Sequence, residues 1–109
     1  MSYGYVVAHV DVTDQNAFEK YSSQVSLVTE AFGGQYLARG GQQESLEGVE
    51  PLGNRTVIIR FDSYKKALKW YHSNEYTELV KLRQAGSNGS WGCWLEEDVK
   101  FPQYYTVYW

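Results

Sequence analysis

The chain has two histidines, His9 and His72, and each stands where its ring could act on a ligand. A partly buried imidazole can take up a proton near neutral pH, so either residue is a candidate general base. His9 shares one face of an expected strand with Tyr5 and Val7. His72 precedes Ser73, at the point where two helical stretches are expected to meet. Either ring could instead be a structural group whose hydrogen bonds are satisfied by its neighbours.

Arg39 is a candidate for holding negative charge. It ends a short strand-like segment and is followed by two glycines, which let a ligand approach the backbone closely. A guanidinium at this place could hold a carboxylate or an enolate through two hydrogen bonds. The alternative is an ion pair with a nearby carboxylate such as Glu44 or Glu47.

Two tyrosines and a serine complete the candidate site. Tyr36 and Tyr71 each combine an apolar ring with a polar hydroxyl, which suits a site for an aromatic or polyketide-like ligand, although the same residues could be ordinary core. Ser73 is expected to cap a helix and could also touch the ligand. Cys93 has no evident activating neighbour, so we interpret it as a packing residue.

Composition and charge exclude several classes of protein. The 109 residues make one domain, and 13 acidic against 10 basic residues give a net charge of -3, which argues against binding to nucleic acid. No apolar segment approaches the roughly 20 residues that span a bilayer, and neither a phosphate-binding glycine loop nor a zinc-ligand spacing is present. One cysteine and no signal-peptide pattern lead us to expect a cytoplasmic protein. Because the motifs and the apolar segment named above are missing, we also expect that it uses no metal or organic cofactor and does not bind membranes.

Hydrophobic periodicity predicts the elements that position these residues. The expected order is β-α-β-β-α-β, with strands at 3–12, 35–41, 55–61 and 91–96. One helix is expected from a cap at Thr13 or Asp14 to Phe32, and another from a cap at Asp62 or Ser63 to Ala85, with a helical pause at 72–74 and a loop at 86–90. This order predicts a ferredoxin-like α+β fold, a four-stranded antiparallel sheet with the helices on one face. We assign residues 1–97 to this domain and 98–109 to an aromatic C-terminal tail.

The first and third expected strands are apolar on both faces, yet the helices can cover only one face. Each large apolar side chain left in water costs roughly 1.5 to 3 kcal/mol. A second copy of the chain, stacked sheet on sheet about a twofold axis, would cover the other face. We therefore predict a homodimer, the alternative being a monomer whose tail folds back over the sheet.

Once the segments are placed, their order resembles a known family. The resembling stretches are GY at 4–5, VDVTD at 10–14, GQYLARGG at 34–41, RTVIIRFDSY at 55–64 and WYHSNEY at 70–76. Together they resemble the domain of unknown function family 1330, within the dimeric α+β barrel superfamily. The resemblance implies a ferredoxin-like protomer that pairs into a barrel, with a pocket between sheet and helices. Superfamily relatives include cofactor-free monooxygenases, lactone isomerases, polyketide cyclases and small binding proteins, so the fold by itself does not name a reaction.

We predict a small homodimer that binds an apolar or aromatic, acid-like metabolite and processes it as a cofactor-independent isomerase, cyclase or monooxygenase. In that mechanism His9 or His72 moves a proton, Arg39 holds developing negative charge, and Tyr36 or Tyr71 donates a hydrogen bond. The alternative from another class is a noncatalytic module for small-molecule binding or protein interaction.

Overall fold

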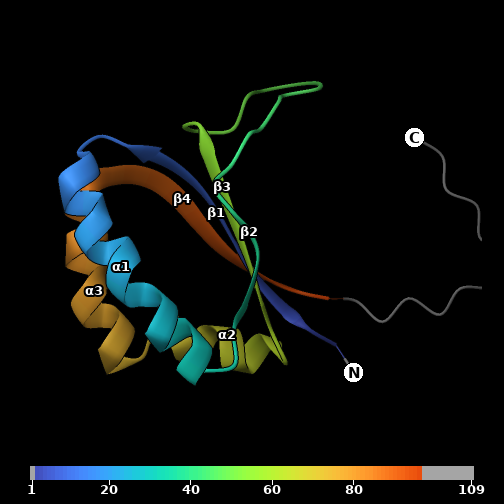
Figure 1. Ribbon diagram of the computed structural model, residues 1–109. Coiled ribbons are helices and arrows are strands. Elements are labelled where there is room, and N and C mark those ends of the chain that lie inside the picture. The colour runs from blue at the N-terminus through green and yellow to red at the C-terminus, as the bar shows by residue number, and fades with distance from the viewer. Residues whose placement is uncertain (1, 97–109) are drawn as a thin grey trace, which may run out of the picture.

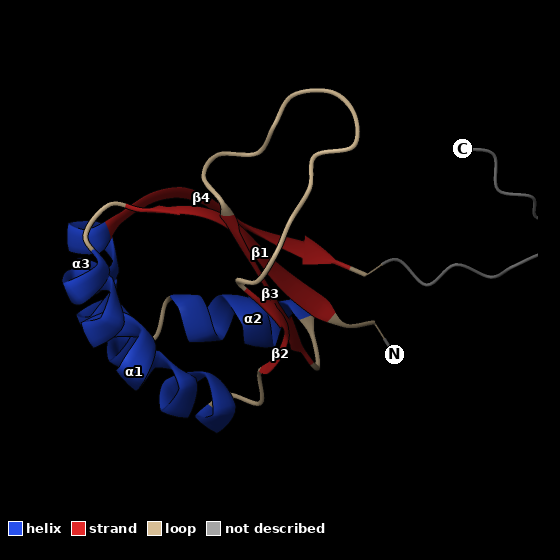
Figure 2. Ribbon diagram, turned by 45° about the horizontal axis from the view of Figure 1, so that its top comes forward, coloured by secondary structure: helices blue, strands red, loops and turns tan. Residues whose placement is uncertain are grey.

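Strand β1 (Gly4–Val12) lies inside a four-stranded antiparallel sheet of order β2-β3-β1-β4, as the computed structural model of residues 2–96 shows (Figure 1). Its neighbours are β3 (Arg55–Phe61) and β4 (Ser87–Leu95), while β2 (Gln35–Arg39) forms the other edge. The helices all lie on one face of this sheet (Figure 2). The predicted ferredoxin-like α+β fold is therefore confirmed for the described residues.

Each helix begins at a side-chain cap, and in each case it is one of the residues that the sequence offers as candidates. Helix α1 (Gln15–Ala31) is capped by Asp14, whose carboxylate accepts the Ala17 N–H at 3.2 Å. Helix α2 (Tyr64–Tyr71) is capped by Ser63 in the same way. Helix α3 (Asn74–Gly86) starts after Ser73, so the predicted pause at 72–74 is confirmed. These caps satisfy backbone donors that a helix start leaves without partners.

The fourth strand starts earlier than predicted. Residues 86–90, rich in Gly, Ser and Asn, were expected as a loop, but β4 begins at Ser87 and pairs with β1 along its whole length, from Val12 to Gly4. Helix α3 ends at Gly86, so it passes into β4 without a connecting loop. At this junction the Gly86 carbonyl accepts hydrogen bonds from the N–H groups of Thr13 and Asp14. Glycine is required at position 89 of this strand, because a Cβ there would lie 2.5 Å from the His9 carbonyl oxygen of β1, which is too close.

Strand β2 is shorter than predicted and irregular. It ends at Arg39, since Gly40 and Gly41 have φ of +76° and +84°, a left-handed conformation that favours glycine. A register shift between Tyr36 and Ala38 disturbs the alternation, so that Tyr36 pairs with a helix-side residue and Arg39 does so as well. Regular alternation along the strand would put Tyr36 and Arg39 on opposite faces, but the register shift places both on the helix side.

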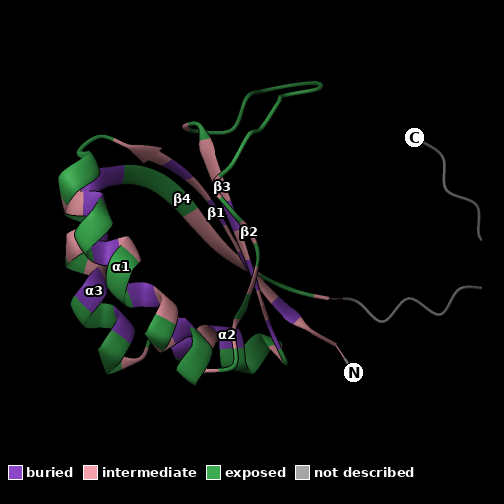
Figure 3. Ribbon diagram, in the orientation of Figure 1, coloured by how far each residue is buried: buried purple, intermediate pink, exposed green. Residues whose placement is uncertain are grey.

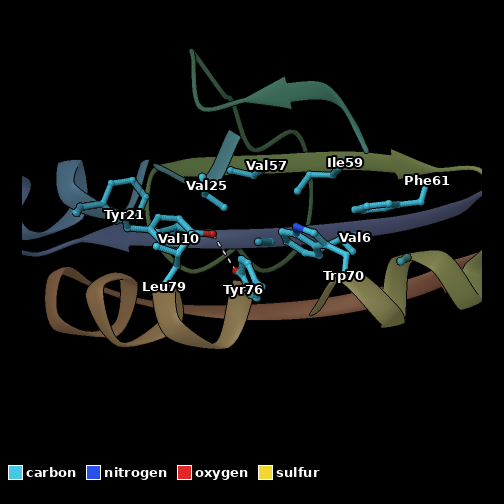
Figure 4. Packing of buried hydrophobic residues seen from close by; sticks show 13 residues of the cluster. Val6, Val10, Tyr21, Val25, Val57, Ile59, Phe61, Trp70, Tyr76 and Leu79 are labelled. Atoms are coloured by element: carbon cyan, nitrogen blue, oxygen red, sulfur yellow. Dashed lines mark hydrogen bonds between the residues drawn. The ribbon is translucent and has the colours of Figure 1, made fainter. Parts of the chain in front are cut away.

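The core fills the space between the sheet and the helices (Figures 3 and 4). Its largest members are Trp70, which is fully buried, Tyr76, Phe61 and Ile59. The opposite side of the sheet carries no helix in the described chain. We call it the bare face and define it by the half-buried residues Tyr5, Val7, His9, Ile58 and Arg60.

The described helices include none that is long and apolar enough to cross a bilayer. The predicted boundary at 97 and the aromatic tail at 98–109 lie outside the described residues. The connection from Gly40 to Asn54 projects away from the sheet and carries the exposed side chains of Leu46, Val49 and Leu52 (Figure 3).

Candidate functional site

A cavity of about 220 Å³ lies between helix α2 and the edge strand β4. We call it the β4 cavity; its lining residues are Val6, Leu68, Tyr71, His72, Trp91, Gly92 and Cys93. Most of this lining is apolar, with two polar groups at the Tyr71 hydroxyl and the His72 ring. Such a combination is typical of pockets that hold small organic molecules.

The sheet register explains why β4 faces this cavity. Cys93 pairs with Val6, and Trp91 pairs with Ala8, both of which are buried under the helices. Because side chains opposite each other in an antiparallel pair share a face, Trp91 and Cys93 also point to the helix side. The helix contributes Leu68, Tyr71 and His72, whose spacing of three and four residues places them on one face of α2.

Tyr71 and His72 are two predicted site residues that the structure brings together. Their rings meet edge to face with centroids 5.4 Å apart. His72 is exposed, and no hydrogen bond of its ring occurs within residues 2–96, so the ring is open to a ligand. Tyr71 is half-buried and packs against Trp70 and Tyr76. This pair is the most chemically versatile part of the cavity wall.

Cys93 serves this cavity as an apolar wall. Burial raises the pKa of its thiol, so the group is protonated at neutral pH. The interpretation of Cys93 as a packing residue agrees with this geometry.

Ser73 lies next to His72 but is occupied by the helix junction. Its hydroxyl accepts the Tyr76 N–H at 3.1 Å and donates to the Trp70 carbonyl at 2.7 Å. The capping role is therefore present, and contact between Ser73 and a ligand stays a prediction.

Tyr36 and Arg39 lie together beside α1, away from the β4 cavity. The Arg39 guanidinium donates to the Ser26 hydroxyl at 2.6 Å and to the Ser22 carbonyl at 2.9 Å, and it lies 4.4 Å from the centre of the Tyr36 ring. The Tyr36 hydroxyl meets Thr29 at 3.1 Å. Neither Glu44 nor Glu47 forms the alternative ion pair, since Asp62 and Lys66 make the single salt bridge of residues 2–96.

These two residues line a second, much narrower space of about 30 Å³ between α1 and the sheet, together with Tyr21 and Trp91. A space of that size holds about one water molecule. A role of Arg39 in holding a ligand stays a prediction, and two of its donors are already used by α1.

His9 lies on the bare face, on the other side of the sheet from His72. Its Nδ1 is 3.2 Å from the Thr56 hydroxyl, which donates to the Gln43 side-chain oxygen at 2.7 Å. The Gln43 amide nitrogen donates in turn to the Gly53 carbonyl, which fixes the orientation of the amide. Because the Thr56 proton is committed to Gln43, Nδ1 of His9 must donate and Nε2 carries the lone pair. His9 is thus oriented as a base, but within one protomer it cannot reach the β4 cavity.

Sequence reasoning missed the polar groups buried under the sheet. Tyr21 and Tyr76 join their hydroxyls at 2.8 Å in the core (Figure 4). Burial raises the pKa of Tyr76 to about 12 and that of Tyr21 further still. Arg83, from the last turn of α3, is 5% exposed. Helical spacing indicates that these positions are buried, but nothing in the sequence pairs them across two helices.

Within the described residues no three His, Cys, Asp or Glu side chains gather as a metal cluster.

Comparison of the sequence with known protein families gives a match. The family model described as Domain of unknown function (DUF1330) matches residues 3–93. The chain belongs to the DUF1330 family. The match includes every residue that lines the β4 cavity.

Solved structures support the fold of this DUF1330 chain. A protein of unknown function from Rhodopseudomonas palustris is 17% identical, with a TM-score of 0.62 over 85% of this chain and 79% of that one. A Caulobacter crescentus protein proposed to be an antibiotic biosynthesis monooxygenase is 14% identical, with a TM-score of 0.59 over 91% of each chain. A cofactor-independent oxygenase from Streptomyces nogalater is 8% identical, with a TM-score of 0.52 over 95% of this chain and 98% of that one. Curated protein sequences gave no match. At these identities the likeness concerns the fold alone.

Proposed function

We propose that the chain binds an apolar or aromatic small molecule with an acidic group in the β4 cavity. The observation that carries this proposal is the cavity itself, about 220 Å³ in volume, with apolar walls and the polar tips of Tyr71 and His72. A wall of this kind favours an aromatic or aliphatic body and leaves few polar positions to select it. The fold likeness to a cofactor-independent oxygenase is compatible with this proposal.

Filling the cavity tests the binding. Leu68→Trp puts a larger side chain into the lining, so the affinity for 2-naphthoate, measured by calorimetry, should fall at least tenfold. Leu27→Trp is the matched control, because Leu27 is 74% exposed on α1 and lines no part of the cavity. Equal affinities in both variants would remove the β4 cavity as the binding site.

An enzymatic form of the proposal rests on the exposed His72 ring beside Tyr71. His72 would take a proton from an acidic carbon of the bound molecule, the electrons would remain in the resulting enolate, and the proton would return at another position. Return of the proton at another carbon completes an isomerisation. Attack of the enolate carbon on a carbonyl of the same molecule, with the proton passing to the new alkoxide, completes a cyclisation, and reaction of the enolate with dissolved O2 as oxidant begins an oxygenation. None of these steps needs an organic cofactor. His9 is the second candidate base, acting from the bare face.

Deuterium exchange at the benzylic carbon of phenylpyruvate tests the two bases. If His72 is the base, exchange catalysed by the wild-type chain disappears in His72→Gln and persists in His9→Gln. Loss in His9→Gln alone would move the chemistry to the bare face. Unchanged exchange in both variants would contradict general-base catalysis and favour the noncatalytic alternative, a binding module. That alternative is favoured by the separation of His9, Arg39 and His72 in one protomer.

The working molecule in this proposal is a cytoplasmic homodimer joined through the bare face. This dimer is supported by apolar side chains that a second sheet stacked on the bare face would remove from water. They are the half-buried Val7 and Ile58, and Trp94, which pairs with Tyr5 on β1 and is 57% exposed. The single cysteine of the sequence is compatible with a reducing compartment.

A further inference from the structure

Arg83 is a buried cation without a counterion in the described chain. Only 5% of the residue is exposed, and its Nε has no hydrogen-bond partner. The one ion pair within residues 2–96 joins Asp62 and Lys66, so no carboxylate of that range neutralises Arg83. Because an arginine stays charged at any physiological pH, the positive charge is held inside the protein.

Trp91 compensates for part of this charge. The guanidinium carbon of Arg83 lies 4.1 Å from the centre of the Trp91 ring, a cation–π contact. The same indole is a wall of the β4 cavity. Arg83 therefore contacts a wall residue of the proposed binding site, although it does not itself line the cavity. An aromatic face attracts a cation but accepts no N–H bond in the plane of the guanidinium, so the buried Nε–H still lacks an acceptor.

Two further kinds of unsatisfied donor lie in the same core. Tyr21 and Tyr76 share one hydrogen bond, so the second hydroxyl proton of the pair has no acceptor among the described residues (Figure 4). The Arg83 charge acts on both hydroxyls, opposing the rise in pKa that burial causes at Tyr76 and at Tyr21. Trp70, whose ring centre is 4.1 Å from that of Tyr76, has a buried Nε1 that is also without a partner.

Every unsatisfied group of this set is a donor. A guanidinium, a phenol and an indole N–H offer hydrogens and positive charge, and a buried donor that stays unsatisfied is costly. A carboxylate is the complementary group, because it is an acceptor with four lone-pair sites and can accept two N–H bonds from one guanidinium.

We propose that Arg83 is the anion receptor of the β4 cavity and binds the carboxylate of a ligand whose apolar body lies against Leu68 and Tyr71. This inference rests on the proposed binding function and assigns to Arg83 the charge-holding role that the sequence suggested for Arg39. Because the Trp91 indole lies between the cavity lining and the guanidinium contact, this binding requires the indole to turn away from Arg83.

The test compares 2-naphthoate with its neutral counterpart 2-naphthamide by calorimetry on the full chain. The wild type should prefer the carboxylate by about 10- to 150-fold, the range expected for a hydrogen-bonded charge pair. Arg83→Met should lose this preference and still bind the amide. Arg60→Gln is the matched control, because Arg60 makes a cation–π contact too, but on the bare face. Its guanidinium carbon lies 4.4 Å from the centre of the Tyr3 ring. The control should keep the preference.

A second measurement does not depend on the cavity. Nitrate at constant ionic strength should raise the thermal midpoint of the wild type but not that of Arg83→Met. Without ligand, Arg83→Met should unfold at the same temperature as the wild type or higher, because it removes an uncompensated buried charge.

The outcomes separate this inference from the proposed function. If the wild type binds naphthoate and naphthamide equally, the anion receptor is wrong and the β4 cavity stands. If neither compound binds but nitrate stabilises the wild type through Arg83, the receptor stands and the proposed cavity ligand is wrong. A clear loss of stability in Arg83→Met, with no effect of nitrate, would show that Arg83 already has a partner in the chain and would overturn the inference.

Discussion

Val7→Lys places a charge in the middle of the bare face and should break the proposed dimer. Val7 pairs with Ile58 on one side and Gly92 on the other, so its position is central to that face. It is already half-buried in the protomer, and completing its burial contributes about 1 kcal/mol. Burying an unpaired ammonium there costs at least about 1 kcal/mol more. Two protomers together lose at least about 4 kcal/mol, which weakens the dimer roughly a thousandfold.

Sedimentation velocity at chain concentrations from about 0.1 to about 100 µM measures this loss of dimer affinity. Leu27→Lys is the matched control, since Leu27 is 74% exposed on α1 and its replacement should leave the dimer intact. Urea unfolding of Val7→Lys should remain cooperative, because the helix side of the sheet holds the core. A wild-type chain that stays monomeric throughout, or a Val7→Lys chain that dimerises as tightly as the wild type, would refute the reasoning.

Three further predictions follow from single hydrogen bonds and one titration. Ser73→Ala removes the cap of α3 and should lower the free energy of unfolding by about 1 kcal/mol, whereas Asn74→Ala should not; equal urea midpoints would contradict the capping role. Nitrogen-15 NMR should find neutral His9 protonated at Nδ1, and Thr56→Val should yield a mixture of tautomers; a mixture in the wild type would disprove the orientation. Burial raises the pKa of Tyr76 to about 12, so the unfolded chain loses this proton first, and stability should fall as the pH rises from about 10 to 12. Tyr76→Phe should flatten that decline, and an unchanged slope would count against the assigned cause.

The fold could be predicted because its pattern is local. Alternation marks Arg55–Phe61 as a strand, the stripe through Phe18, Tyr21 and Val25 marks α1, and Ser73 marks the start of α3. What failed was the start of β4, where Ser87 to Ser90 have the composition of a turn. Pairing with β1 supplies the hydrogen bonds that hold these residues extended, and this pairing is not encoded in their own composition.

The candidate site could be predicted only in part. Tyr71 and His72 lie on one wall because they follow Leu68 by three and four residues, a spacing that the sequence shows. The direction of Arg39 depends on the register shift in β2, a tertiary feature that alternation does not reveal. Helical spacing places Arg83 in α3 but says nothing of its charge partners, since the absence of a counterion becomes apparent only when α1, α3 and β4 are packed together.

Methyl NMR of the full chain with 2-naphthoate tests the central claim, binding in the β4 cavity, most directly. The methyl groups of Val6 and Leu68 line that cavity, and those of Val7 and Ile58 lie on the bare face as internal references. The account predicts saturable shifts at Val6 and Leu68 with Val7 and Ile58 unchanged. Shifts confined to Val7 and Ile58, or none at Val6 and Leu68 at millimolar naphthoate, would contradict it.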